Sequence, residues 1–89
     1  MQAIAYETPK TFIPEVLHVD ILQAVSRDHS CPPRRVVERL LPSYTERVIR
    51  SGIRNLLVQG YLAEDTPGGG IVLRLTSKGR ILLQKEGAA

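Results

Sequence analysis

The stretch SYTERVIRSGIRNLLVQGYL, residues 43–62, decides how this chain folds. Its apolar side chains recur every three to four residues, so on a helix they share one arc. Three cations gather in a second arc, about a third of a turn away: Arg47, Arg50 and Arg54. Gly60 stands where a left-handed C-terminal cap is expected. The stretch therefore predicts an amphipathic helix over residues 43–59, with Ser43 or Thr45 as its N-cap.

Two shorter helices are predicted before this one. Apolar residues recur at helical spacing over residues 14–27, where Pro14 can occupy the first turn. A second periodic segment, residues 34–41, follows Pro32 and Pro33 and is stopped by Pro42. Residues 1–12 show no sustained periodicity. They predict an N-terminal arm, either extended or forming a loose first strand, followed by one domain over residues 13–89.

After Gly60 the apolar period changes to two. Residues 61–65 and 71–75 predict two strands, and the sequence TPGGG between them predicts the turn of a hairpin. Thr76 or Ser77 can cap a final helix. That helix carries Ile81, Leu82 and Leu83 in succession, so one of them must point away from any single buried face. It either packs on the domain's own core or forms a dimer seam. Tyr6 and Phe12 either belong to such a seam or cover the first helix.

Composition is that of an ordinary small globular domain. The 89 residues are 43% hydrophobic and 24% charged, and the formal net charge of +3 suits an anionic partner without singling one out. Cys31 is the single cysteine and cannot form an internal disulfide. No apolar run exceeds four residues, which disfavours a transmembrane helix or a signal peptide. The expected location is the cytoplasm.

No enzyme chemistry is predicted, and no cofactor or metal. His18, His29 and Cys31 are too few and too scattered for a four-ligand site. No motif places a nucleophile within reach of a base and an orienting third group. The three glycines of TPGGG are not followed by Lys-Ser or Lys-Thr, so they indicate a hairpin turn rather than a phosphate-binding loop.

Three consecutive segments carry a resemblance to a known family. They are IRNLLVQGYLAED (residues 53–65), TPGGG (66–70) and IVLRLTSKGR (71–80). The chain resembles the winged helix-turn-helix transcription regulators, in particular the MarR-like and PadR-like groups, over roughly residues 14–86. This resemblance implies a small winged helix-turn-helix domain of the α+β class, with three helices, a β-wing of two to three strands over residues 61–76, and a C-terminal helix.

The resemblance also implies a sequence-specific, DNA-binding transcriptional regulator. Its partner is double-stranded DNA, with the helix of residues 43–59 in the major groove. It is expected to be a homodimer through the N-terminal arm, the C-terminal helix or both. Carried over, the groove-facing set is Tyr44, Thr45, Arg47, Arg50, Ser51 and Arg54; Arg34 and Arg35 contact phosphate, with Arg39 adding charge; and Gly69 and Arg74 belong to the wing. An arginine suits this role because its planar fork of donors grips phosphate or takes guanine O6 and N7 together.

Three other interpretations stay open from the residues alone. The arginine face can be an ordinary solvated surface in which Glu46 pairs with Arg50 one turn later. A winged helix can also serve as a protein-interaction module, or as an accessory subunit of a nucleoprotein assembly, with this face meeting an acidic surface. Finally, the protein can bind the shape of DNA rather than its sequence.

Overall fold

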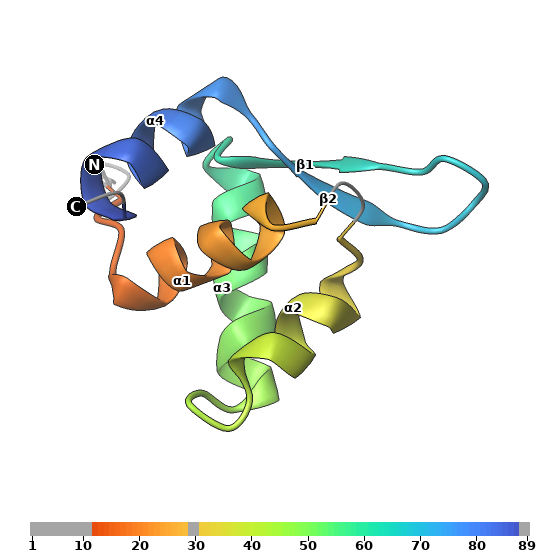
Figure 1. Cartoon of the computed structure of the whole chain (residues 1–89), viewed down its shortest axis with the longest axis horizontal. Helices are drawn as coiled ribbons and strands as arrows, with labels where there is room; N and C mark the ends of the chain where they lie inside the picture. Colours follow the sequence, from red (N-terminus) through yellow and green to blue (C-terminus); the bar gives the residue numbers. More distant parts are fainter. Residues whose placement is uncertain (1–11, 29–30, 88–89) are drawn as a thin grey trace, which may run out of the picture.

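The chain folds as three helices, a hairpin and a final helix. The computed structural model describes residues 12–28 and 31–87. Its elements are α1 (Val16–Ser26), α2 (Pro33–Leu40), α3 (Glu46–Val58), β1 (Leu62–Asp65), β2 (Val72–Leu75) and α4 (Ser77–Gly87) (Figure 1). This order confirms the predicted α+β winged-helix architecture. The predicted arm lies outside the described residues, apart from Phe12.

Local caps set the two ends of α3. Thr45, one of the two predicted caps, accepts a hydrogen bond from the Val48 N–H through its side chain at 3.3 Å. At the other end Gly60 adopts a φ of 85°, and the Tyr61 N–H donates to the Leu56 carbonyl at 2.9 Å. These bonds form a left-handed termination that satisfies carbonyls left open by the last turn. Because both signals are local, the sequence predicted this helix closely.

The core lies where α1, α2 and α3 meet the hairpin. Its fully buried side chains include Ile21, Leu22, Val36, Ile49, Leu56 and Leu73. Helices α1 and α3 cross at Gly52, where an added Cβ would stand 2.7 Å from Ile21 Cδ1 and 3.2 Å from Leu17 Cδ2. The missing side chain therefore lets the backbone of α3 approach α1. This crossing orients the opposite face of α3 towards solvent.

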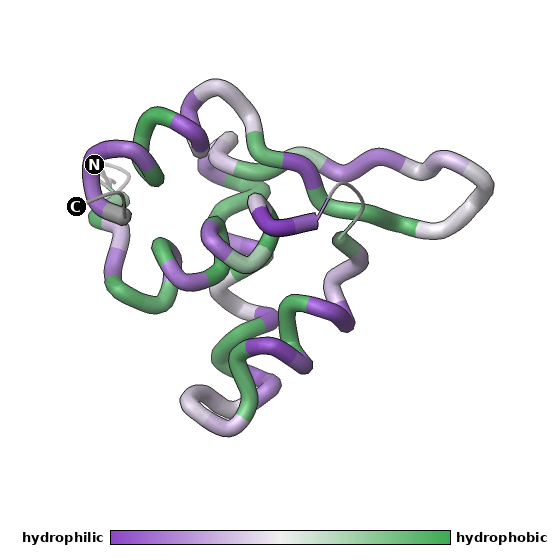
Figure 2. The backbone as a smooth tube through the Cα atoms, viewed as in Figure 1, coloured by the Kyte–Doolittle hydropathy of each residue, from purple (hydrophilic) through white to green (hydrophobic). Residues whose placement is uncertain are grey.

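The hairpin extends from the body of the molecule as a long wing (Figure 1). β1 and β2 pair antiparallel, with Leu62 opposite Leu75 and Asp65 opposite Val72. A third segment joins through one isolated bridge, in which the Leu73 N–H donates to the Cys31 carbonyl at 2.8 Å. β2 is mainly hydrophobic, whereas β1 becomes hydrophilic towards the wing tip (Figure 2). The base of the wing is thus anchored in the core, and its tip extends into solvent.

The final helix packs against α1. Thr76, one of the two predicted caps, accepts a hydrogen bond from the Gly79 N–H at 3.1 Å and donates one to the Gly60 carbonyl at 2.6 Å. Leu82 and Leu83 pack against the core cluster, while Ile81 is 58% exposed. The prediction that one of three consecutive apolar residues points outward is confirmed. Phe12 also packs inward, with its ring centroid 4.9 Å from His18 and 5.5 Å from Tyr61.

The buried imidazole of His18 forms a hydrogen bond with the backbone at the start of α1. His18 is 6% exposed, and its Nδ1 accepts a hydrogen bond from the Glu15 N–H at 2.9 Å, so this nitrogen carries no proton. Desolvation lowers the pKa of His18 against a smaller opposing effect of Glu15. In the unfolded chain the imidazole regains its ordinary pKa and binds more protons in acid.

We therefore expect stability to fall as the pH drops below the ordinary histidine range, because protonation removes the acceptor and charges a buried ring. Urea unfolding midpoints measured at several pH values between neutrality and mild acid test this. His18→Gln is expected to show a shallower pH dependence than wild type. Parallel curves for the two proteins would mean that another group carries the effect.

Candidate nucleic-acid interface

The face of α3 opposite the core carries the predicted arginines. Ile49, Gly52, Ile53 and Leu56 are buried, whereas Arg47, Arg50, Ser51 and Arg54 are all exposed. Arg50, Ser51 and Arg54 line one shallow hollow of about 300 Å³. We refer to Arg47, Arg50, Ser51 and Arg54 as the α3 face. Its groups are donors or hydroxyls on a single helix, the arrangement that fits the edges of base pairs and phosphates.

Neighbouring elements border this face on one flank. A second hollow of about 260 Å³ is lined by residues of α2, α3 and β1, namely Pro33, Arg50, Ile53, Arg54, Leu57 and Glu64. The start of α2 and the first strand of the wing therefore lie beside the α3 face. Sequence reasoning did not place Pro33, Leu57 or Glu64 in the site, since their approach to α3 depends on how the helices and hairpin pack.

Several candidate cations already have carboxylate partners. Arg50 donates through Nε to Glu46 at 2.8 Å, as one of the open interpretations predicts. Asp28 accepts from both Arg35 (3.4 Å) and Arg39 (3.1 Å). By contrast, within residues 12–28 and 31–87 no ion pair involves Arg34, Arg47 or Arg54, although all three are exposed. Among the predicted contact residues, these three cations are the most open to a new anion.

Tyr44 and Thr45, both predicted to face the groove, each make a side-chain hydrogen bond within the protein. The Tyr44 hydroxyl donates to the Asp20 carboxylate at 2.8 Å, and its half-buried ring packs against the core. This hydrogen bond raises the pKa of the Tyr44 hydroxyl. Tyr44 thus ties the connection between α2 and α3, which contains a cis Leu41–Pro42 bond, to α1. The side-chain oxygen of Thr45 accepts the hydrogen bond that caps α3.

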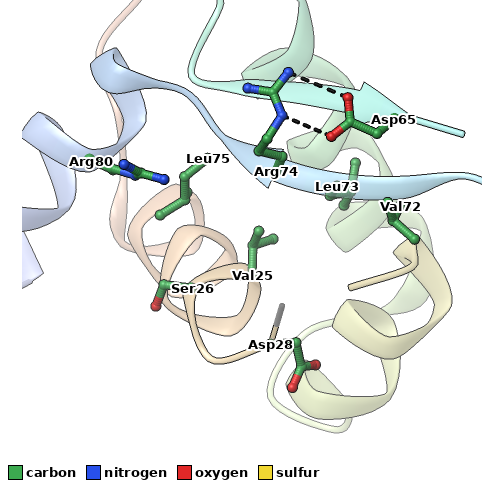
Figure 3. Close-up of a pocket in the computed structure, with 9 residues that line it drawn as sticks. All are labelled: Val25, Ser26, Asp28, Asp65, Val72, Leu73, Arg74, Leu75 and Arg80. Atoms are coloured by element: carbon green, nitrogen blue, oxygen red, sulfur yellow. Dashed lines mark hydrogen bonds and ion pairs between the residues drawn. The ribbon is translucent and has the colours of Figure 1, made fainter. Parts of the chain in front are cut away.

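The wing contributes a paired arginine and a glycine tip. Arg74 on β2 donates through Nε and Nη2 to the two carboxylate oxygens of Asp65 on β1, at 2.8 and 3.4 Å (Figure 3). The carboxylate raises the pKa of Arg74, which keeps it charged. Gly69, at the exposed tip, has a φ of 95°. Close approach of the tip backbone to another molecule is therefore sterically open.

A larger cavity lies on another side of the wing. It has a volume of about 470 Å³ and is lined by the end of α1, by β2 and by Arg80 of α4, with Asp28 and Asp65 at its edge (Figure 3). None of its lining residues belongs to α3. The α3 face and this cavity are therefore separate surfaces. In the part of the chain that the structure describes, no cluster of three or more potential metal ligands occurs.

Comparison with known proteins supports the fold. No known protein family matches the sequence, and no curated protein matches it significantly. Among solved structures, BpsR of Bordetella bronchiseptica matches with a TM-score of 0.69 and 20% identity over 83% of this chain. That structure is described as showing how 6-hydroxynicotinic acid regulates DNA binding by BpsR. The likeness shows that the two share a winged-helix fold, and the present chain covers 53% of the BpsR chain.

Proposed function

We propose that this protein is a sequence-specific DNA-binding transcriptional regulator that places α3 in the major groove. The observation that carries the proposal is the α3 face, an exposed set of arginines set opposite the buried side of the same helix. The major groove of B-DNA, about 12 Å wide, admits a helix of this kind. The resemblance to BpsR, whose DNA binding is regulated, adds support for this class of function.

The paired and unpaired cations take different parts in the proposed complex. Arg47 and Arg54 on α3 reach base edges and phosphates directly. Arg34, at the start of α2, binds phosphate together with the positive end of the helix dipole. Arg35, Arg39 and Arg74 exchange their carboxylate partners for phosphate, or share them, as DNA arrives. The wing lies along the backbone or minor groove.

We also propose that the protein acts as a homodimer in the cytoplasm. Ile13 and Val16 near the start of α1 are 74% and 71% exposed, and Ile81 on α4 is 58% exposed. A mainly apolar groove of about 670 Å³ runs between α1 and α4, with Val19 and Leu82 among its lining residues. A second copy would cover this surface, and a symmetric pair would read two half-sites. Within the described residues no helix is long and apolar enough to cross a membrane.

Selection of random duplex DNA by the purified protein tests the proposal. We expect one enriched motif with two-fold symmetry, bound with an affinity that falls as salt rises, because phosphate contacts release counterions. The selection is run at two salt concentrations, so that the base-specific contribution to affinity can be separated from the electrostatic one. Binding without an enriched motif would favour a protein that reads DNA shape. Absence of binding at either salt would overturn the proposal and favour a protein-interaction module.

A further inference from the structure

We infer that Glu46 is a positioning residue that fixes the guanidinium of Arg50 for the edge of a guanine. The inference rests on the proposed DNA-binding function. Glu46 and Arg50 are one helical turn apart, and the Arg50 Nε–H donates to Glu46 Oε2 at 2.8 Å. Both side chains are about half exposed, so the pair lies on the surface of α3 rather than in the core. A surface pair of this kind contributes little to folding.

The atoms used in the pair decide what Arg50 can still bind. A guanidinium has five N–H donors, and the contact to Glu46 uses the single Nε–H. The two Nη groups remain, and they present the parallel donors that match guanine O6 and N7. Arg74 is held differently, since Asp65 occupies both its Nε and its Nη2. The contact to Glu46 therefore holds Arg50 and leaves its outer fork open.

Glu46 is itself well placed to act as a fixed support. It is the acidic residue of the first turn of α3, where the helix dipole stabilises a carboxylate. On the outer side, Arg50 shares its hollow with Ser51 and Arg54, so its guanidinium lies on the α3 face. A carboxylate beside this fork also repels phosphate. The pair consequently directs Arg50 towards a base edge and away from the backbone.

Repeating the selection with Glu46→Ala tests this positioning. We expect the preference for guanine at one motif position to fall about fivefold, because the fork loses its orientation but not its donors. Affinity for nonspecific duplex is expected to rise about twofold, since a negative charge has been removed. Glu46→Gln keeps a side-chain acceptor and should retain most of the preference. Arg50→Lys, which has no fork, should abolish it.

Glu38→Ala is the matched control for charge. Glu38 is exposed on α2, and no ion pair involves it within the described residues. Its replacement by Ala changes the net charge by the same amount as Glu46→Ala. We expect it to raise nonspecific affinity without changing any base preference. If Glu46→Ala behaves like Glu38→Ala, the positioning role is wrong while the proposed function stands. If wild type itself selects no motif, the proposed function fails and the inference fails with it.

Discussion

Replacing Gly79 by Ala is expected to lower the free energy of unfolding by about 3 kcal/mol or more. A Cβ at this position would collide with the carbonyl oxygen of Tyr61. The oxygen belongs to the backbone, and the Tyr61 carbonyl accepts a hydrogen bond from the Thr76 N–H at 3.2 Å, so it cannot simply turn aside. Relief requires the first turn of α4 to move away from the base of the wing.

Thermal unfolding followed by circular dichroism measures this effect. For a domain of this size, a loss of about 3 kcal/mol corresponds to a fall in Tm of roughly 12 °C or more. Gly70→Ala is the matched control, because a Cβ there meets no atom within 4 Å and its φ is not left-handed. Its Tm should stay close to that of wild type. Equal Tm values for Gly79→Ala and wild type would mean that α4 is not seated against the wing as the structure has it.

The elements of the fold were predictable because their signals are local. Thr45, Gly60 and Thr76 each act on backbone groups within a few residues, and Pro32 and Pro33 mark the start of α2. Such signals place helix ends without knowledge of the tertiary structure. The boundaries of the strands and helices consequently differ from the predicted ones by one or two residues, except that α3 begins three residues later than predicted.

The contacts that organise the site were not predictable in the same way. Tyr44 lies in the turn before α3, and the resemblance to winged-helix regulators placed it in the groove-facing set. Its partner Asp20 lies 24 positions earlier, on a helix whose rotation about its axis depends on the packing at Gly52. Likewise, Asp28 meets Arg35 and Arg39 only because α1 and α2 fold together. Periodicity tells which face is buried but not which distant side chain it meets.

The ion pairs also determine which positive charges can attract a distant phosphate. Arg35, Arg39, Arg50 and Arg74 each face a carboxylate, so their attraction for distant phosphate is reduced. Arg47 and Arg54 are exposed and have no ion pair within residues 12–28 and 31–87. The field of the α3 face is therefore dominated by a few side chains. Removing them should affect DNA binding far more than removing the same charge elsewhere.

The combined variant Arg47→Ala, Arg50→Ala, Arg54→Ala is expected to lose at least about 100-fold in affinity for the selected duplex, given about 1–3 kcal/mol for each good base contact. The matched control removes the same charge from outside the site: Arg27→Ala, Arg80→Ala, Lys85→Ala. All three control residues are exposed: Arg27 directly follows α1, and Arg80 and Lys85 lie on α4. Because both variants lose three positive charges, the difference between them reports contacts made by the α3 face.

Fluorescence anisotropy with labelled duplex, at two salt concentrations, makes this comparison. The α3 variant should lose its preference for the motif and show a shallower dependence of affinity on salt, since fewer phosphate contacts remain. The control variant should keep the preference and lose only part of the affinity. Circular dichroism establishes that both variants stay folded, as expected for exposed positions. Equal losses in the two variants would mean that net charge, and not the arginine face of α3, accounts for binding.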